Sequence, residues 1–307
     1  MFNFLFGLFK FKKKRRQEPN RLPDDYSDFD FVNMTELYYK NPWLTKDENP
    51  MGLESLWFDC NNNIEKLVLK RLINKFKYVD QQDAKARTKI VLEKCIDDWL
   101  LKPDNTLFIA FKIEEFADGS SIALNFIRAR ISEISELWKV NNFIGDLHRG
   151  KRRFRDGNLR NVVLIDDFVG TGGTAKKRID DVKKDMLEKN KDLNLFVFSL
   201  GGMISGKRKI ESCKVKYACT YLIDKGTNIA FPKPINFLAR KRILKMEDLL
   251  HEGSINLPLN KFSLGYEKSE ALYSWNVFNI PNNNYPIFWW NQYKNGSRRK
   301  PIFTRSQ

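Results

Sequence analysis

The chain has 307 residues, of which 54 are Lys or Arg and 38 are Asp or Glu, so its formal net charge is +16 at pH 7. A hydrophobic fraction of 42% with only 16 Gly and 11 Pro is typical of a folded core and excludes a largely disordered or collagen-like chain. Uncharged apolar runs of about 18 residues are absent, which excludes a helix that spans a bilayer unaided.

The excess of positive charge favours partners that carry phosphate: a polynucleotide, an anionic lipid surface or a phosphorylated small molecule. The four cysteines show no disulfide-like or CxxC spacing, which is typical of thiols in a reducing compartment. The two histidines, His148 and His251, have no His or Cys at metal-ligand spacing, so a zinc site is not expected.

Residues 1–25 are expected to form a basic, aromatic N-terminal arm. Phe and Leu alternate through Phe11, and the basic run 12–16 follows. A secretory signal has the opposite order, so we expect a cytoplasmic protein. Two interpretations stay open: an arm that docks on an anionic membrane, nucleic acid or a partner protein, or an element packed on the protein's own body.

Residues 26–103 are predicted to be mainly helical. Apolar side chains recur at three- and four-residue steps over 64–76. A second helix is expected over 83–101, with Asp83 as its N-cap and Pro103 after its end.

Residues 104–232 alternate short apolar runs with helical stretches. Strands are expected at 106–111, 162–165, 195–200 and 217–223, and helices at 120–138 and 174–189. This alternation predicts an α/β fold with a mostly parallel central sheet and helices on both faces. Helical N-terminal and aromatic-rich C-terminal additions would flank it, the latter being a hood-like extension over 233–307.

The most informative stretch, 161–177, reads NVVLIDDFVGTGGTAKK. Asp166 and Asp167 follow an apolar strand where it should leave the sheet, and a glycine-rich loop with Thr171 leads to a helix that opens at Thr174. Glycines turn backbone N–H groups inwards, and a helix N-terminus favours negative charge, so the loop predicts a phosphate site. Two carboxylates beside it predict contact with sugar hydroxyls or phosphate-bound Mg²⁺. The residues alone describe a site for a ribose 5′-phosphate.

The segment VVLIDDFVGTGGT also resembles the phosphoribosyl pyrophosphate (PRPP) signature of type I phosphoribosyltransferases. The resemblance implies a type I phosphoribosyltransferase-like fold, PRPP or a related ribose 5-phosphate compound as ligand, and Mg²⁺ as cofactor. It implies that Asp166 and Asp167 bind the ribose 2′- and 3′-hydroxyls and contact Mg²⁺ indirectly. The implied 5′-phosphate loop comprises Val169, Gly170, Thr171, Gly172, Gly173 and Thr174.

After the first expected core strand, where type I salvage enzymes carry a short pyrophosphate loop of small residues, the chain reads KIEEFADGSSIALNF. The candidate leaving-group contacts here are Lys112, Asp118, Gly119 and Ser120. Glu114, Glu115 and Asp118 place negative charge where pyrophosphate would lie, which disfavours transfer from PRPP. Glu115 is the candidate general base acting on water; the alternative is a solvated acidic turn.

Before the signature strand, 145–160 reads GDLHRGKRRFRDGNLR. Type I enzymes close a flexible basic loop over the diphosphate at this place, and the candidate basic groups here include Arg155. Lys151 and Arg153 are candidates for catalysis and Arg152 for leaving-group contact, with His148 as a candidate proton carrier. The alternative is an exposed basic loop that contacts nucleic acid or nothing.

The C-terminal stretch LGYEKSEALYSWNVFNIPNNNYPIFWW adds a second resemblance. With the aspartate signature, it is similar to phosphoribosyltransferase-like proteins encoded in bacterial conflict and antiphage systems, including effector partners of retrons. This implies a toxic effector whose partners include nucleic acid (tRNA or a reverse-transcribed RNA–DNA) or a defence-complex protein. The aromatic side chains form either a hood for a base, contacted by Asn282, Asn283 and Trp289, or part of the core.

The leading hypothesis is a phosphoribosyltransferase-like glycosyltransferase that acts at the anomeric carbon of a ribose 5-phosphate unit. Hydrolysis of the N-glycosidic bond of a nucleotide or NAD is the variant reaction. The alternative is a catalytically inactive partner subunit that senses phosphoribose and binds nucleic acid.

Overall fold

The computed structural model describes residues 26–46, 49–111, 119–155, 159–187, 193–253 and 258–305. The chain divides into two compact units, each built from segments that are separated in sequence. Unit 1 comprises the described residues up to Phe76, Gly226–Leu264 and those from Tyr285 onward, and unit 2 comprises Lys77–Lys225 and Gly265–Asn284.

The four consecutive segments predicted from the sequence, 1–25, 26–103, 104–232 and 233–307, cut across these units. The first lies outside the described residues. The first long helix of unit 2 lies in the second predicted segment, and one short strand of unit 2 lies in the fourth. Both elements belong to unit 2 because they pack with the central sheet.

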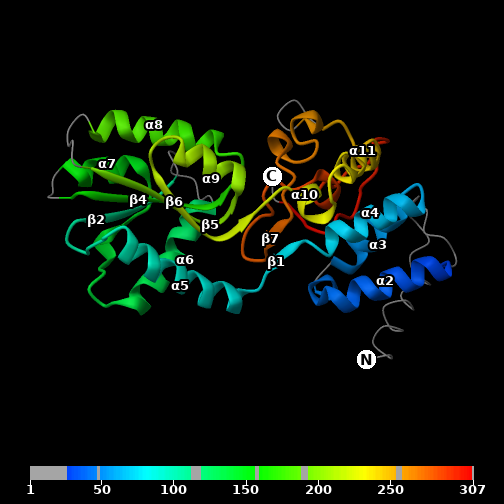
Figure 1. The fold of residues 1–307 in the computed structure, drawn as a ribbon, viewed down its shortest axis with the longest axis horizontal. Helices are drawn as coiled ribbons and strands as arrows, with labels where there is room; N and C mark the ends of the chain where they lie inside the picture. The colour runs from blue at the N-terminus through cyan, green and yellow to red at the C-terminus, as the bar shows by residue number, and fades with distance from the viewer. Residues whose placement is uncertain are drawn as a thin grey trace. The chain divides into compact units, whose positions relative to one another are not determined.

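Unit 1 is mainly helical (Figure 1). It contains α2 (Asp28–Lys40), η2 (Pro42–Thr45), α3 (Asn49–Asp59), α4 (Asn63–Ile73), α10 (Gly226–Ala230), α11 (Ile235–Glu247), η4 (Leu259–Lys261) and η6 (Pro286–Phe288). The expected helix at 64–76 corresponds to α4, whose N-cap Asn62 accepts a hydrogen bond from Glu65 N at 3.1 Å. Glu65 Oε2 in turn accepts one from Asn61 N at 2.8 Å, so two backbone donors at this helix start are satisfied.

Unit 2 holds the strands. Its elements are β1 (Lys77–Val79), α5 (Gln81–Asp98), β2 (Thr106–Ala110), α6 (Gly119–Ile134), η3 (Val140–Asn142), β3 (Phe143–Ile144), α7 (Leu147–Arg155), β4 (Asn161–Val169), α8 (Gly173–Leu187), β5 (Asn194–Met203), α9 (Ile204–Glu211), β6 (Lys216–Ile223), η5 (Tyr266–Lys268) and β7 (Tyr273–Trp275). Five strands form one parallel sheet in the order β3-β2-β4-β5-β6, and β1 pairs in parallel with β7. This confirms the predicted mostly parallel α/β class.

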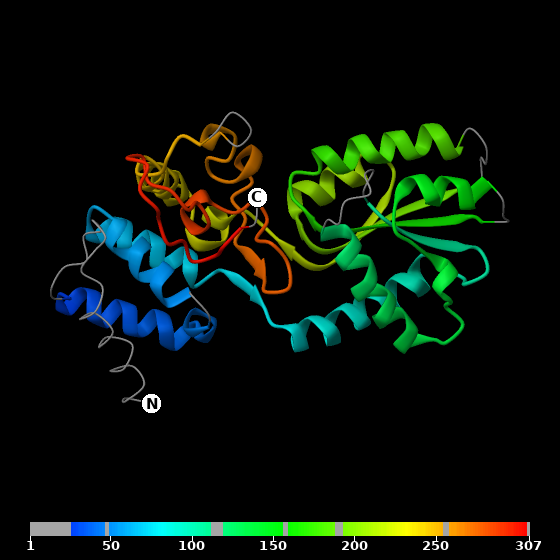
Figure 2. The ribbon, with the colours of Figure 1, turned by 180° about the vertical axis from the view of Figure 1, so that it is seen from behind.

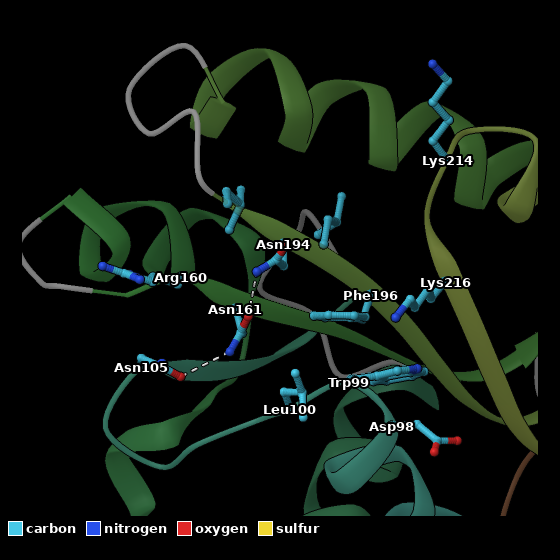
Figure 3. Close-up of a pocket in the computed structure, with 12 residues that line it drawn as sticks. Asp98, Trp99, Leu100, Asn105, Arg160, Asn161, Asn194, Phe196, Lys214 and Lys216 are labelled. Carbon is cyan, nitrogen blue, oxygen red and sulfur yellow. Dashed lines mark hydrogen bonds between the residues drawn. The ribbon is translucent and has the colours of Figure 1, made fainter.

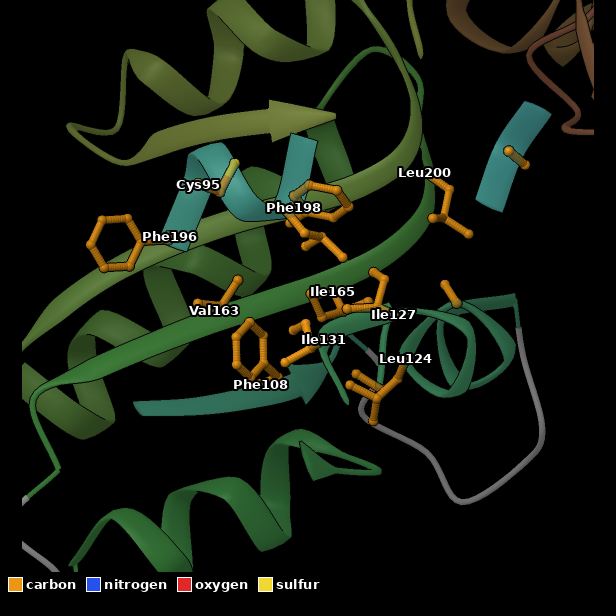
Figure 4. Close-up of a cluster of buried hydrophobic side chains, with 14 of the residues drawn as sticks. Cys95, Phe108, Leu124, Ile127, Ile131, Val163, Ile165, Phe196, Phe198 and Leu200 are labelled. Atoms are coloured by element: carbon orange, nitrogen blue, oxygen red, sulfur yellow. The ribbon is translucent and has the colours of Figure 1, made fainter. Parts of the chain in front are cut away.

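Helices cover both faces of this sheet (Figures 1 and 2). On one face, α5 and α6 pack over Val163 and Ile165 of β4, as Figure 4 shows for α6. On the other face, α7, α8 and α9 pack over Val162 and Leu164. Alternate residues of a strand point to opposite faces, so a strand buried on both must be apolar throughout.

Two sequence expectations need correction at element ends. Helix α5 begins at Gln81, because Asp80 is the N-cap and its Oδ1 accepts a hydrogen bond from Gln82 N at 2.8 Å. Asp83, the expected N-cap, lies in the first turn and accepts a hydrogen bond from the Tyr221 hydroxyl at 2.9 Å. The signature strand runs on to Val169 instead of ending at 165.

Within the described ranges, no helix is long and apolar enough to cross a membrane.

A buried ion pair in unit 1 gives a stability prediction. Arg299, whose side chain is 1% exposed, donates from Nε to Asp59 at 3.0 Å and from an Nη atom to the Trp290 carbonyl at 3.0 Å. Arg299→Ala leaves both acceptors without this donor, and we expect a loss of about 3 kcal/mol in unfolding free energy by urea denaturation. The exposed neighbour variant Arg298→Ala is the control, and an equal loss in both would contradict this role.

Burial of Glu247 gives a pH-dependence prediction. The side chain is 4% exposed, and burial raises the pKa of its carboxyl to about 7 although Ser263 and Leu264 N donate to it. The pKa of Glu247 is higher in the folded protein than in the unfolded chain, so protonated Glu247 contributes to stability. This contribution is complete below about pH 4.5 and is lost as the pH rises through about 7. Glu247→Gln should therefore gain about 2 kcal/mol relative to wild type between pH 4.5 and 8, measured by urea unfolding across that range. A difference that does not vary with pH would contradict the assignment.

Candidate functional site

The sheet topology places the candidate site at the carboxyl ends of the central strands. The chain passes from β2 to β3 on one side and then to β4 on the other side of β2, so the strand order reverses at β2 and β4. Ligands of parallel α/β sheets bind off the carboxyl ends of the strands at such a reversal. The loops that leave β2 and β4 therefore define the site.

Asp166 and Asp167 lie at the end of β4, within the strand, and both are half-buried. A Cβ atom on Gly119, the first residue of α6, would lie 2.2 Å from Asp167 Oδ2, so Asp167 faces the α6 side of the sheet. Asp166 pairs in register with Ser199, whose hydroxyl lies 2.7 Å from the Tyr217 hydroxyl in the core of the opposite face. The two carboxylates thus face opposite sides of one strand.

The pKa shifts of two buried tyrosines agree with this division. Burial above all, and the charge of Asp166 to a lesser degree, raises the pKa of Tyr217. Burial and then the charge of Asp167 raise the pKa of Tyr273, whose ring belongs to the cluster on the α6 face. Each aspartate therefore has its own surroundings.

The close approach of Gly119 to Asp167 brings the start of α6 next to the end of β4. Only a residue without a side chain allows the start of α6 to approach the carboxylate this closely. Of the predicted leaving-group contacts, Gly119 therefore lies next to Asp167, and Ser120 is buried in the first turn of α6. Lys112, Glu114, Glu115 and Asp118 lie outside the described residues.

The loop after β4 has the geometry of an anion cradle. Val169 is buried at the strand end, and α8 begins at Gly173. Gly172 has a φ of 82°, a conformation that glycine adopts without strain, and its carbonyl accepts the Lys176 N–H at 2.9 Å in the first turn of α8. Thr174 is exposed at the start of the helix. The glycine-rich turn leads directly into the N-terminus of α8, and such a helix N-terminus favours negative charge.

A C-terminal segment of unit 2 completes this loop. A Cβ on Gly170 would lie 2.1 Å from Asn283 Nδ2, so the Asn283 side chain lies directly against the loop. The Thr171 hydroxyl donates a hydrogen bond to the carboxylate of Glu267. Sequence reasoning missed Glu267, because no local pattern marks a carboxylate that reaches the loop from almost a hundred residues away.

The other expected hood residues behave differently. The Asn282 carbonyl accepts a hydrogen bond from Tyr266 N at 3.0 Å and so anchors the same segment. Trp289 belongs to unit 1, where it is 4% exposed and packs edge-on against Phe262 with ring centroids 5.8 Å apart. Its surroundings fit the alternative interpretation, a core residue.

The basic stretch before β4 folds as helix α7 and not as a loop over most of its length. Asp146 Oδ1 accepts a hydrogen bond from Arg149 N at 2.8 Å at the helix start, and Gly150 packs against Ile109 of β2. Lys151 forms an ion pair with Asp185 of α8. His148, Arg152 and Arg153 are exposed, whereas the side chain of Arg155 lies outside the described residues.

The carboxylates of Asp166 and Asp167 supply only part of the ligands that Mg²⁺ needs. Among the residues that the structure describes, no three His, Cys, Asp or Glu side chains cluster as metal ligands. Asp166 and Asp167 offer carboxylate oxygens, which Mg²⁺ prefers, but two carboxylates leave most of an octahedral shell to water and ligand phosphates. The site thus fits an ion that arrives with a diphosphate, and the predicted indirect contact stays a prediction.

A second concave region lies at the opposite edge of the sheet, where β4 and β5 begin (Figure 3). It has a volume of about 440 Å³, and the charged side chains that line it are Arg160, Lys214, Lys216 and Asp98. A row of amides crosses it, with Asn161 donating to Asn105 at 3.0 Å and Asn194 donating to Asn161 at 3.1 Å. The cationic lining gives this region an affinity for anions.

Comparisons with known proteins show a family for this chain. A solved structure of the Helicobacter pylori Xanthine-Guanine-Hypoxanthine Phosphoribosyltransferase is similar over 48% of this chain and 82% of that chain, with 10% sequence identity and a TM-score of 0.28. A search of the curated proteins finds no match. The model of the PRTase-CE family matches residues 43–305, which is most of the chain. The chain therefore belongs to the PRTase-CE family and is a phosphoribosyltransferase-like protein.

Proposed function

We propose that the protein is a glycosyltransferase-type enzyme that acts at the anomeric carbon of PRPP or a related ribose 5-phosphate compound. The contact of Gly119 with Asp167 carries the proposal. It brings the start of α6 to the Asp167 carboxylate, which precedes the glycine-rich loop at the reversal point of a parallel sheet.

In this proposal the residues hold the sugar at both ends. The loop Gly170 to Thr174 binds the 5′-phosphate through backbone N–H groups, and Asp166 and Asp167 accept hydrogen bonds from the ribose 2′- and 3′-hydroxyls. A sugar fixed in this way loses rotational freedom before reaction, which lowers the barrier to attack at the anomeric carbon. The nearby carboxylates also stabilise positive charge that develops on the ring as the leaving group departs.

The leaving group would lie near the start of α6. Gly119 and Ser120 begin this helix. Arg152 and Arg153 are exposed on α7, which packs on the opposite face of the sheet, so a contribution of their positive charge to the leaving group stays a prediction. Mg²⁺, when bound through Asp166 and Asp167 by way of water, would neutralise the charge of a diphosphate. Glu115 stays a candidate base. Lys151 stays a candidate catalytic residue, although it is paired with Asp185 and must first leave this partner.

We also propose a role as a toxic effector of a bacterial antiphage system, including those of retrons. The resemblance of the LGYEKSE and PNNNYPIFWW segments to proteins of such systems supports this role. The acceptor would then be a base, water or a macromolecule such as tRNA, with hydrolysis of a nucleotide or NAD as the variant reaction. Partners in this proposal are a defence-complex protein or nucleic acid, with a membrane contact through residues 1–25.

One observation favours a second candidate function, a phosphoribose sensor that binds nucleic acid. The formal charge of +16 and the cationic region containing Arg160, Lys214 and Lys216 would both attract a polynucleotide. Steeply salt-dependent polynucleotide binding that persists in an Asp166→Asn variant, without turnover of PRPP, would support it.

The aspartates give the direct test of the proposed function. Asp166→Asn and Asp167→Asn each remove a charged acceptor, and we expect each to weaken PRPP binding by about tenfold or more in titration calorimetry with Mg²⁺. Asp181→Asn, which removes the same charge from an exposed position of α8, is the matched control. PRPP affinity that stays at the wild-type value in both site variants, with their folding verified by circular dichroism, would refute the proposal.

The close approach of Gly119 gives a second prediction. In Gly119→Ala the new Cβ would collide with the Asp167 carboxylate, which must move aside because it is the end of a flexible side chain. We expect PRPP affinity to fall by about tenfold while the melting temperature changes little. Gly145→Ala is the control, since a Cβ there meets nothing within 4 Å. Equal PRPP affinity in the two variants would show that Asp167 needs no fixed position.

A further inference from the structure

The carboxylate of Glu267 occupies the phosphate loop. Glu267 accepts a hydrogen bond from the Thr171 hydroxyl, and its two carboxylate oxygens lie 3.8 and 3.9 Å from the position that a Cβ would take on Gly173. A hydroxyl has one proton to donate, so Thr171 cannot serve Glu267 and a phosphate oxygen at the same time. The chain itself therefore supplies an anion to the loop.

The backbone around Glu267 adopts an unfavourable conformation. Glu267, Lys268 and Glu270 have φ values of 52°, 56° and 57°, in the left-handed region that residues with a side chain rarely adopt. Such a conformation persists only where the surroundings impose it, and it occurs frequently at sites that bind ligands.

Backbone contacts to 282–284 impose this conformation. Tyr266 N donates to the Asn282 carbonyl at 3.0 Å, and Ala271 N donates to the Asn283 carbonyl at 2.9 Å. The Ser269 hydroxyl also lies 3.0 Å from the Asn283 carbonyl. Residues on both sides of Glu267 are thus fixed to one anchor, and the same Asn283 packs its side chain against Gly170 of the loop. The contacts of its neighbours therefore hold the Glu267 carboxylate at the loop.

A ligand can nevertheless replace Glu267 as the acceptor of the Thr171 hydrogen bond. Glu267 is exposed and Thr171 is only half-buried, so a ligand can reach the loop and replace the carboxylate without disturbing the core. A phosphate carries up to two negative charges and three terminal oxygens, whereas a carboxylate carries one charge and two oxygens. A phosphorylated ligand therefore gains more from the loop than Glu267 does.

We propose that Glu267 is an internal competitor for the phosphate loop, whose carboxylate occupies the loop until a phosphorylated ligand displaces it. The proposal rests on the phosphate-binding role of the loop in the proposed function. A nucleoside or free sugar offers no anion and leaves Glu267 in place, whereas a 5′-phosphate exchanges with it. Glu267 thereby lowers the affinity for every phosphate by competition and like-charge repulsion.

Titration calorimetry with inorganic phosphate and with PRPP and Mg²⁺ tests this role in wild type, Glu267→Gln and Glu267→Ala. We expect both variants to bind each probe about fivefold more tightly, which is the effect of removing a like charge about 4 Å away in water. Glu136→Gln removes the same charge from an exposed position beyond the far end of α6 and should match wild type. Circular dichroism and thermal unfolding verify the fold of each variant.

The outcomes separate this proposal from the proposed function. PRPP binding with the same affinity in wild type and both Glu267 variants, or weaker in the variants, would overturn the displacement while leaving the phosphoribosyl site intact. Tighter phosphate binding in the variants, with PRPP no better than phosphate, would support displacement and overturn the phosphoribosyl function. Absence of binding of either probe to any variant would overturn both.

Discussion

The close approach of the α6 start to the end of β4 is the constraint on which the candidate site depends. Parallel strands direct their carboxyl ends to one end of the sheet, and the strand order reverses at β2 and β4, which is where ligands of such sheets bind. Gly119 then allows a helix start to lie against the Asp167 carboxylate. A side chain at this position would push the Asp167 carboxylate away from the start of α6.

The remaining parts of unit 2 support this arrangement from both faces of the sheet. Burial of β4 under α6 on one side and α8 on the other fixes the strand that carries both aspartates. The segment 265–284 contains β7, which pairs with β1 apart from the five-stranded sheet. The same segment places Glu267 and Asn283 at the glycine-rich loop. The loop is therefore shaped by contacts that are local in sequence and by contacts that are distant.

The local part could be predicted from the sequence. An apolar run, two aspartates and a glycine-rich loop before a helix are consecutive residues whose conformations depend mainly on one another, and the structure has the expected strand, loop and helix. Element ends were less predictable, because Asp80 and Asp83 both suit a helix start and only the geometry of the first turn selects Asp80. The strand also continues through Phe168 and Val169, since both pair with β5.

Contacts between distant segments could not be predicted in the same way. The basic stretch around Gly150 looked like a loop, but packing of Gly150 on Ile109 and burial of Leu147 favour a helix. The positions of Glu267 and Asn283 depend on contacts with a loop that is distant in sequence, and hydrophobic periodicity does not predict such contacts. Trp289 shows the converse case, because its aromatic neighbours suggested a ligand platform and the structure packs it against Phe262.

A crystal structure of the protein soaked with PRPP and Mg²⁺ tests the central claim most directly. The account predicts density for a 5′-phosphate within hydrogen-bond distance of the backbone N–H groups from Gly170 to Thr174, with the ribose hydroxyls on Asp166 and Asp167. It also predicts that the Glu267 carboxylate has left Thr171. Density for the ligand at any other place, with the loop still holding Glu267, would contradict it.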